Sequence, residues 1–306
     1  MKKWQKEFVT YGQESGYGID DKSPLCPIIQ GTLLPQHLEN NAFYDSRLKA
    51  YDDNLHLTFD AHEEVEALVR EKLISRLSPE GKTILELGAG TGRDSVIFLE
   101  SFEDVRLVVL EPAPGMLHVA LEKIIKTGAP ALAINSGAEK IPLPDNSVQG
   151  VYSFGGFNEF TDKKAVINEI VRVCETGARV VLCDEGIPPW WRETDFYRIL
   201  RHTNIQFEAD PPLKYLPVEA RNAELSWVIG ETFWVISFDI AGGPPQGKFD
   251  IPIPGAKGGT LNSRYFGQVE GVSSEVREAL TRHVSSGIES EHSAVEKALR
   301  NYLLQD

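Results

Sequence analysis

Hydrophobic residues recur along this chain at two spacings, and segments with the two spacings alternate between residues 83 and 185. Short apolar runs, the pattern of buried strands, cover residues 83–88, 105–111, 131–135, 148–154 and 178–185. The intervening helical spacing is found in residues 95–102, 114–126 and 163–174. This alternation predicts a parallel sheet that is covered by helices on both faces.

The segments next to this core have patterns of their own. Residues 60–78 predict a helix that begins at a capping box of Asp60 and Glu63. The apolar face of that helix consists of Val65, Leu68, Val69, Leu73 and Leu77. Residues 224–230 and 232–241 are so close in sequence that they predict an antiparallel hairpin, so the sheet ends on a reversed strand.

The amino-acid composition of the chain changes after Ile240. Residues 241–260 are rich in glycine and proline and predict a long loop, and helical patterns return around residues 276–280 and 295–303. We therefore expect three parts, an N-terminal extension of residues 1–59, an α/β domain of residues 60–240 and a C-terminal extension of residues 241–306.

The composition favours an ordinary globular protein and opposes some classes of partner. The formal net charge of -14 argues against nucleic acid, which is usually bound by clustered Lys and Arg. No apolar stretch approaches the roughly 20 residues that span a bilayer, and the N-terminus lacks the apolar middle of a signal peptide. We expect a cytoplasmic protein without a membrane partner. Cys26, Cys174 and Cys183 are widely spaced, which predicts buried thiols and no zinc site.

A glycine-rich turn follows the first of the alternating strands. Gly88, Gly90 and Gly92 precede a helix-like run, and glycine lets a backbone adopt positive φ and approach a ligand closely. A dinucleotide-binding turn has glycine at its sixth position, where this chain has Arg93. The strand residue Glu86 would repel a pyrophosphate and suits a cationic ligand. The turn therefore disfavours a nicotinamide-dependent oxidoreductase.

A carboxylate closes the second of these strands. Glu111 follows Gly88 at close to the spacing of roughly 20 residues at which such folds place an acid on ribose hydroxyls. A carboxylate accepts both hydrogen bonds of a vicinal diol with good geometry. An acidic residue at a strand end is often only a solvent-exposed side chain without a function. The combination of Glu111 with the glycine turn nevertheless predicts that Glu111 contacts a ligand.

Four segments in this order resemble the class I S-adenosylmethionine-dependent methyltransferases, particularly the group that includes quinone and natural-product methyltransferases. The segments are residues 85–95, 108–120, 137–160 and 166–185. The resemblance implies a Rossmann-like, doubly wound α/β fold. Its seven-stranded, mostly parallel sheet would have an antiparallel last strand, with an N-terminal helical lid and a C-terminal helical extension. It also implies S-adenosyl-L-methionine as cofactor and in-line methyl transfer to a small-molecule acceptor.

The resemblance further assigns parts of the cofactor site by position. Glu86, Gly88, Ala89 and Gly90 would line the methionine end, and Glu111 would bind the ribose hydroxyls.

The adenine end and the meeting point with the acceptor are assigned in the same way. Pro112 and Met116 would flank the adenine, and Ala138 and Glu139 would read its edge. Ser153 would lie where cofactor and acceptor meet.

Two departures from the family pattern affect the expected site. Gly137 stands where relatives commonly carry the acid that accepts from the adenine amine, so adenine recognition falls to Glu139 or to backbone. Asn158 and Glu159 stand just after the fourth of the alternating strands, where many relatives carry histidine.

The catalytic group is less evident than the cofactor site. A sulfonium methyl is already activated, so a base is needed only for an acceptor that is protonated at working pH. The candidates are Glu159, Asp184, Glu185 and His202, and the position of Glu159 after the fourth strand ranks it first. Adjacent residues such as Asp184 and Glu185 point to opposite faces of a strand, so we predict no metal.

Other aromatic residues are candidates for the acceptor site. Trp190, Trp191, Phe196 and Tyr197 suit either an acceptor wall or the packing of a helix. The lid candidates are Tyr44, Tyr51 and Phe59. Residues 258–273 suit either a pocket loop or the contact of a homodimer.

A second function remains open at this point. The same fold and cofactor would serve an accessory protein that binds S-adenosylmethionine or its demethylated product, or a catalyst of other chemistry on a methyltransferase scaffold. The missing acid at Gly137 and the missing histidine motivate this alternative.

Overall fold

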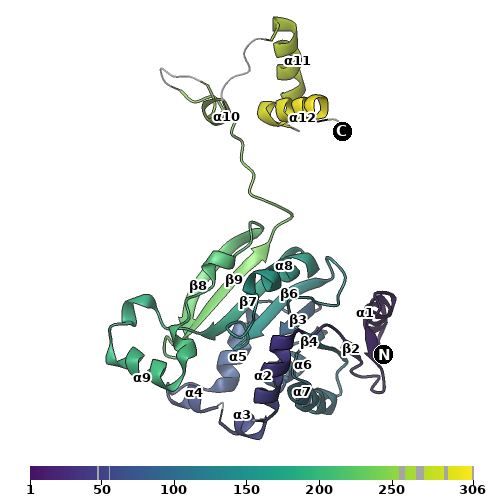
Figure 1. The fold of residues 1–306 in the computed structure, drawn as a ribbon, viewed down its shortest axis with the longest axis vertical. Helices are drawn as coiled ribbons and strands as arrows, with labels where there is room; N and C mark the ends of the chain where they lie inside the picture. The colour runs from purple at the N-terminus through teal and green to yellow at the C-terminus, as the bar shows by residue number, and fades with distance from the viewer. Residues whose placement is uncertain (47, 55, 255–258, 267–271, 286–288, 305–306) are drawn as a thin grey trace. The chain divides into compact units, whose positions relative to one another are not determined.

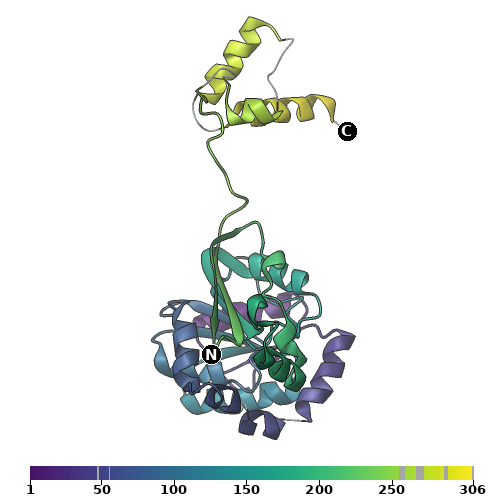
Figure 2. The ribbon, with the colours of Figure 1, turned by 90° about the vertical axis from the view of Figure 1, so that its left-hand side faces the viewer.

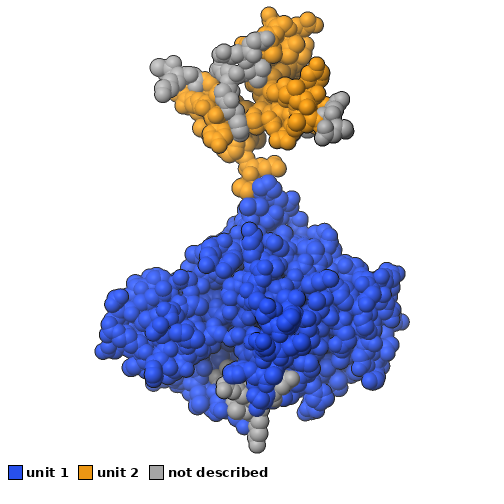
Figure 3. All heavy atoms as spheres, in the orientation of Figure 1, with its two compact units in different colours: residues 1–244 blue, residues 245–306 orange. Residues whose placement is uncertain are grey.

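The computed structural model describes residues 1–46, 48–54, 56–254, 259–266, 272–285 and 289–304. Its internal contacts divide the chain into two compact units, residues 1–244 and residues 245–306, which are coloured separately in Figure 3. All four motifs lie in the first unit.

A nine-stranded sheet forms the centre of the first unit, in the order β1-β2-β5-β4-β3-β6-β7-β9-β8 (Figure 1). The strands are β1 (Gly18–Asp20), β2 (Ile28–Gln30), β3 (Thr83–Leu87), β4 (Arg106–Leu110), β5 (Ala131–Asn135), β6 (Val148–Phe154), β7 (Cys174–Glu185), β8 (Ala220–Val228) and β9 (Phe233–Ile240). Strands β1 and β9 run opposite to the other seven. The predicted α/β class and the reversed last strand are confirmed, and the short β1–β2 hairpin widens the sheet beside β5.

Helices cover both faces of this sheet, as Figures 1 and 2 show. The α-helices of the first unit are α1 (Lys3–Glu14), α2 (Pro35–Asp45), α3 (Leu48–Asn54), α4 (His56–Asp60), α5 (Glu66–Ser75), α6 (Arg93–Ser101), α7 (Pro114–Thr127), α8 (Lys163–Val173) and α9 (Asp195–Thr203). Short 3-10 turns lie at Pro189–Trp191, Ile205–Glu208 and Leu213–Tyr215. One buried core contains residues of α1 and α8, and the other contains residues of α5, α6, α7 and α9.

The alternation of side chains along a strand explains the two cores. In β3, Leu85 and Leu87 belong to the core with α8, whereas Ile84 belongs to the core with α5 and α6. All three side chains are fully buried. A strand with two buried faces reads as a continuous apolar run, which is why these strands were predictable.

Close packing of the glycine-rich turn against α7 requires a glycine. Gly92 has a φ of 76°, in the left-handed region, and a Cβ there would lie 2.9 Å from Cα and Cβ of Ala120. No other residue type fits this position without backbone movement.

The predicted capping box at the start of α5 is wrong. Helix α4 ends at Asp60, Glu63 has a φ of 57°, and α5 begins only at Glu66. A left-handed residue cannot continue a helix, so the two elements remain separate. Leu73 on the predicted apolar face is buried, whereas Leu68 is 64% exposed.

The second unit contains three described helices, α10 (Leu261–Phe266), α11 (Ser274–Val284) and α12 (Glu291–Leu303). The hydroxyls of Ser273 and Ser290 cap α11 and α12 by accepting hydrogen bonds from backbone N–H groups. The helical patterns predicted around residues 276–280 and 295–303 lie within these two helices. Residues 258 and 267–271 of the proposed loop or dimer contact lie outside the described part of the chain. Across the described residues, no helix has the length and apolar character needed to cross a bilayer.

Candidate functional site

Two cavities lie where the parallel strands end and the following loops begin. The larger has a volume of about 570 Å³ and the smaller a volume of about 90 Å³. Both are lined by Gly88, Gly90, Gly155, Tyr44 and Glu159. The carboxyl ends of parallel strands are where open α/β sheets bind ligands. The shared lining residues therefore mark one site with two compartments.

Glu111 fixes the glycine turn that separates the compartments. Its Oε2 accepts a hydrogen bond from the backbone N–H of Gly90 at 2.8 Å, and its Oε1 accepts one from Ala113 at 2.9 Å. The residue is only 7% exposed and lines the smaller cavity. Each carboxylate oxygen has two lone-pair sites, so a carboxylate can accept more than one hydrogen bond at each oxygen.

The smaller cavity is lined by three of the four residues that the resemblance assigned to adenine, whereas Glu139 is not among its lining residues. Pro112, Met116 and Ala138 all line it. Helix α2 covers it, since Asn41 Nδ2 donates to the carbonyl of Pro112 at 2.8 Å and Asn41 is itself a lining residue.

A buried histidine and glutamate occupy the position of the missing family acid. His37 Nε2 lies 3.0 Å from Glu139 Oε2, and both side chains are less than 10% exposed. The backbone N–H of Leu34 donates to His37 Nδ1 at 2.9 Å, so in a neutral ring the proton is on Nε2, facing Glu139. A Cβ at Gly137 would lie 1.9 Å from His37 Cε1 and 2.8 Å from Glu139 Oε2. The pair thus explains why residue 137 is glycine.

Two of the predicted cofactor residues lie behind the site. Glu86 is 3% exposed and its Oε2 accepts from Ser95 Oγ at 2.6 Å. Burial, followed by the charge of Asp94, raises the pKa of Glu86 well above its ordinary range. Ser153 is fully buried and its hydroxyl donates to the carbonyl of Leu87 at 3.0 Å. In the described part of the chain neither Glu86 nor Ser153 lines the two cavities, so both support the turn from below.

The larger cavity has an aromatic wall. The rings of Phe154 and Phe233 stack with centroids 5.6 Å apart, and the rings of Phe59 and Phe154 stack with centroids 6.3 Å apart. The guanidinium of Arg70 lies 4.3 Å from the centroid of Phe154. Arg70 also pairs with Asp94 at 2.6 Å and is 3% exposed. The wall offers a flat apolar face to a planar ligand.

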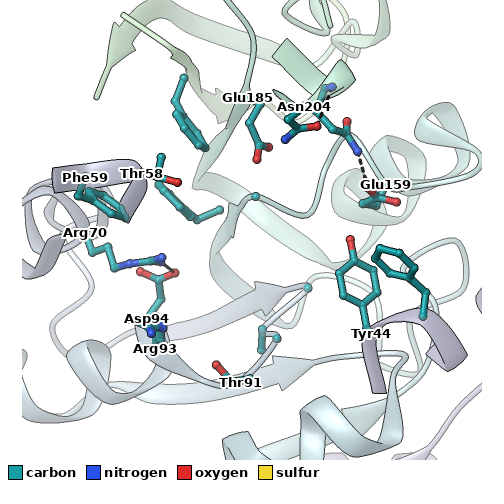
Figure 4. A pocket seen from close by; sticks show the side chains of 18 of the residues that line it. Tyr44, Thr58, Phe59, Arg70, Thr91, Arg93, Asp94, Glu159, Glu185 and Asn204 are labelled. Carbon is teal, nitrogen blue, oxygen red and sulfur yellow. Dashed lines mark hydrogen bonds and ion pairs between the residues drawn. The ribbon is translucent and has the colours of Figure 1, made fainter. Parts of the chain in front are cut away.

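The carboxyl groups of Glu159 and Glu185 also line the larger cavity (Figure 4). Gln206 Nε2 donates to Oε1 of Glu159, and the side chain of Tyr44 forms a further hydrogen bond to it. Burial, followed by the charge of Asp184, raises the pKa of Glu159 above its ordinary value. Burial also raises the pKa of Glu185 well above its ordinary range, with a hydrogen bond and charge from Asp184 as further causes.

Asp184, another predicted base, is held away from the cavity. Its Oδ2 accepts from the backbone N–H of Asn158 at 2.7 Å, and its Oδ1 accepts from the Asn158 side chain at 3.1 Å. The residue is 1% exposed. These hydrogen bonds make Asp184 a structural clamp between the loop after β6 and the end of β7.

The remaining candidates from the sequence lie elsewhere. His202 lines a separate surface hollow beside Arg198 and Arg201. Trp190 is 67% exposed, and Tyr197 is buried in the core that contains α9.

Of the lid candidates, Phe59 and Tyr44 line the larger cavity. The side chain of Tyr51 lies outside the described residues.

An aspartate on α3 ties the lid to the glycine turn. Asp52 Oδ1 accepts from Thr91 Oγ1 at 2.6 Å, and Asp52 Oδ2 lies 2.7 Å from Lys123 Nζ. Arg93 Nε lies 3.3 Å from Asp52 Oδ1. Burial alone would raise the pKa of Asp52, but the hydrogen bonds from Lys123 and Thr91 outweigh it and hold the pKa below the ordinary value.

Sequence reasoning missed His37, Asp52, Arg70, Asn204 and Gln206, which line the site or hold its lid. Three of them come from the region before the first motif and two from the loop after α9. The glycine at 137 was the one available signal, since a missing acid implies a substitute.

Comparison with known proteins decides the family of the first unit. Residues 84–177 match the family model of a methyltransferase domain. This segment contains the glycine turn, Glu111 and the loop of Gly137 to Glu139. The chain contains a class I S-adenosylmethionine-dependent methyltransferase domain.

Relatives of this methyltransferase domain agree with that assignment. The chain is 31% identical over 108 residues to a demethylmenaquinone methyltransferase of Thermus thermophilus, which is 35% of this chain and 49% of that protein. It is 32% identical over 117 residues to a ubiquinone/menaquinone biosynthesis C-methyltransferase of Xanthomonas campestris, covering 37% of this chain and 46% of the relative. The chain thus spans about half the length of the curated relatives that it matches.

The solved structures show the same fold for the methyltransferase domain. Phosphoethanolamine N-methyltransferase 2 of Haemonchus contortus, solved with S-adenosyl-L-methionine, aligns with a TM-score of 0.50 at 12% identity. The alignment covers 65% of this chain and 60% of that one. The predicted family, fold and cofactor are confirmed.

Proposed function

We propose that this protein transfers the methyl group of S-adenosylmethionine to a small-molecule acceptor. The observation that supports it most is the joining of a compartment lined by Glu111, Pro112 and Met116 and a larger, aromatic-walled compartment at Gly88 and Gly90. One compartment suits the cofactor's nucleoside and the other an acceptor, and the turn between them would hold the methionine end.

The smaller compartment fits an adenosine group by the chemistry of its donors and acceptors. Glu111 would accept hydrogen bonds from the ribose hydroxyls while it continues to hold Gly90 and Ala113. Pro112 and Met116 would flank the adenine.

The adenine amine would be recognised by the buried pair beside Gly137. Glu139 Oε1 is buried and has no hydrogen-bond partner among the described residues. Its Oε2 also has no hydrogen-bond partner among the described residues, although it lies 3.0 Å from His37 Nε2. A buried acceptor without a partner is costly, and a donor from a ligand would remove that cost. The adenine amine is such a donor.

The cofactor supplies a sulfonium-bound methyl group that is already electrophilic. The chain's own task is therefore to bind, to orient and to exclude water. Gly88, Ala89 and Gly90 would let the backbone approach the methionine end, with Glu86 and Ser153 supporting them from behind. The lid residue Tyr44 and the stacked Phe154 would close the compartment from two sides.

The acceptor compartment suits a molecule with a flat apolar body. The stacked wall of Phe59, Phe154 and Phe233 offers its face to such a body. Two relatives are named quinone methyltransferases, and we carry over from them only that the acceptor is a small molecule with a planar part. Glu159, at the boundary of the two compartments, is placed to receive a proton from an acceptor.

The test is transfer of label from S-adenosyl[methyl-³H]methionine to a panel of small planar acceptors, with cofactor binding measured separately by calorimetry. We expect binding of the cofactor and of its demethylated product, together with labelled product from at least one acceptor. Tight binding without any transfer would favour the alternative of an accessory protein, and absence of binding would overturn the proposal.

A further inference from the structure

The charges that face the larger cavity do not balance. Its two lining arginines are already paired, Arg70 with Glu66 and Asp94, and Arg93 with Glu66 and Asp52. Two lining carboxylates, Glu159 and Glu185, form no ion pair with any Lys, Arg or His in the described part of the chain. These two carboxyl groups thus line the cavity without a cation of the chain paired to them.

Glu185 is the better placed of these two carboxylates to meet an acceptor. It ends β7, and Figure 4 shows its carboxylate pointing into the cavity. Its neighbour Asp184 accepts two hydrogen bonds from Asn158 and also forms a side-chain hydrogen bond to Glu185. Glu159 is held by Gln206 at the boundary with the smaller compartment.

The charge of Lys163 acts on Glu159, but Lys163 forms no ion pair with Glu159 or Glu185 among the described residues. Lys163 Nζ donates to the backbone carbonyls of Asn158 at 2.8 Å and Phe160 at 3.1 Å. Both bonds fix the loop after β6. A ligand that brings its own positive charge is the natural partner for Glu185.

We infer that the acceptor is an amine, bound as its ammonium ion by Glu185 and Glu159 with its apolar body against the phenylalanine wall. This inference rests on the proposed function. An ammonium gains from the unpaired carboxylates and from the aromatic faces of Phe154 and Phe233. A phenolate or a carboxylate would meet like charge in a buried site, which disfavours it. A neutral quinol gains from the wall alone.

The reaction balances with Glu185 as proton acceptor. An ammonium has no lone pair, so one N–H proton first passes to the Glu185 carboxylate and leaves a neutral amine. The nitrogen lone pair then forms the bond to the methyl carbon while the electron pair of the C–S bond stays on sulfur. The product is a methylated ammonium ion and a neutral thioether. The raised pKa of Glu185, caused chiefly by its burial, brings its basicity closer to that of the proton it must take.

The test compares ligands of one shape and different charge. Binding of 2-phenylethylamine, 2-phenylethanol and 3-phenylpropanoate is measured by calorimetry on the full chain saturated with S-adenosylhomocysteine. Tryptamine, tryptophol and indole-3-propanoate form a second, larger series. We expect an amine to bind at least tenfold more tightly than its alcohol and its acid in one series or both. We expect Glu185→Gln to remove that preference.

Two further measurements distinguish a failure of the amine inference from a failure of the proposed function. Glu193→Gln, at an exposed carboxylate outside the cavity, is the matched control and should keep the preference. The affinity of Glu185→Gln for S-adenosylhomocysteine should stay within twofold of wild type. A large loss there would mean that Glu185 holds the cofactor's own amino group and would overturn the inference, as would no amine preference in either series. Failure of the wild-type chain to bind S-adenosylhomocysteine would instead overturn the proposed function.

Discussion

His37 on α2 reaches the loop after β5 and places its Nε2 3.0 Å from Oε2 of Glu139. The two residues are about a hundred positions apart, yet together they fill the space beside Gly137. The family's usual acid at that position would collide with the His37 ring. We propose that adenine recognition falls to this pair instead of to residue 137.

This relocation can be tested by restoring the family pattern. Glu139→Ala removes the buried acceptor, and we expect about tenfold weaker binding of S-adenosylhomocysteine, since one such hydrogen bond contributes about 1–3 kcal/mol. Gly137→Asp alone should also lose binding, because its Cβ would lie 1.9 Å from His37 Cε1. Combining Gly137→Asp with His37→Ala and Glu139→Ala should recover affinity relative to Glu139→Ala. Calorimetry on the four proteins decides the matter, and a triple variant no better than the single ones would refute the relocation.

Glu111 stabilises the glycine turn and is also the residue that we expect to bind the ribose of the cofactor. Its replacement by alanine removes two hydrogen bonds to backbone N–H groups, from Gly90 and Ala113, besides any contact to ribose. We expect Glu111→Ala to weaken S-adenosylhomocysteine binding about a hundredfold or more, because charge-assisted hydrogen bonds are the strong ones. Glu122→Ala, at an exposed carboxylate of α7, is the control and should leave the dissociation constant unchanged. Equal affinities for Glu111→Ala and wild type would remove the ribose assignment.

Asp52 holds the lid helix α3 to the glycine turn and to α7. Asp52→Ala removes the contacts to Thr91, Lys123 and Arg93 together. We expect a loss of about five- to tenfold in cofactor affinity, because this partly exposed cluster contributes less than a buried one. Amide hydrogen exchange in residues 48–54 should also become faster. Asp53→Ala changes the exposed neighbour and should do neither. If the two variants behave alike, the cluster does not fasten the lid.

Glu185 should destabilise the protein when no ligand is bound. Its pKa is raised by burial and by Asp184, so the folded chain holds this proton more tightly than the unfolded chain does. The stability linked to that proton is fully present below the unfolded pKa of about 4.3 and is lost as pH rises through the folded pKa. Glu185→Gln cannot lose a proton, so we expect its melting temperature to exceed that of wild type by about 2 °C or more at pH 8.

Measuring the melting temperatures of wild type and Glu185→Gln at several pH values identifies the cause of the difference between them. Near pH 4.5, where wild-type Glu185 is protonated, the two melting temperatures should nearly coincide. Thermal unfolding followed by circular dichroism from pH 4.5 to pH 8 provides the measurement. A difference that is the same at every pH would assign it to packing instead of to ionisation.

The strands and the turn were predictable because each is encoded locally. Strand β3 is buried on both faces, so its apolar run stands out, and the glycines after it are required by positive φ and by the approach to Ala120. The same locality explains why Glu111, Pro112 and Met116 were found, since they follow one strand end.

Features that depend on distant segments were not predictable in this way. The strands of the β1–β2 hairpin are three residues each, too short for a periodic signal. His37, Asp52 and Gln206 act on the site only because the fold brings their elements together. The start of α5 was missed for a local reason, since the sequence pattern continues past Glu63 while the left-handed backbone of Glu63 keeps α4 and α5 separate.

The role of Glu185 likewise required the three-dimensional arrangement. In sequence, Asp184 and Glu185 are equivalent neighbours. In the structure the Asp184 carboxylate is held by Asn158, whereas Glu185 lines the cavity.

The central claim is that the two joined compartments bind S-adenosylmethionine. Thermal unfolding of the purified chain with S-adenosylmethionine, with S-adenosylhomocysteine and with NAD tests it most directly, because a ligand that binds only the folded state raises the melting temperature. At a hundred times the dissociation constant the gain is about 2.7 kcal/mol, which is easily measured. We expect a shift with the first two ligands and none with NAD. A shift with NAD alone, or no shift with any of the three, would contradict the account.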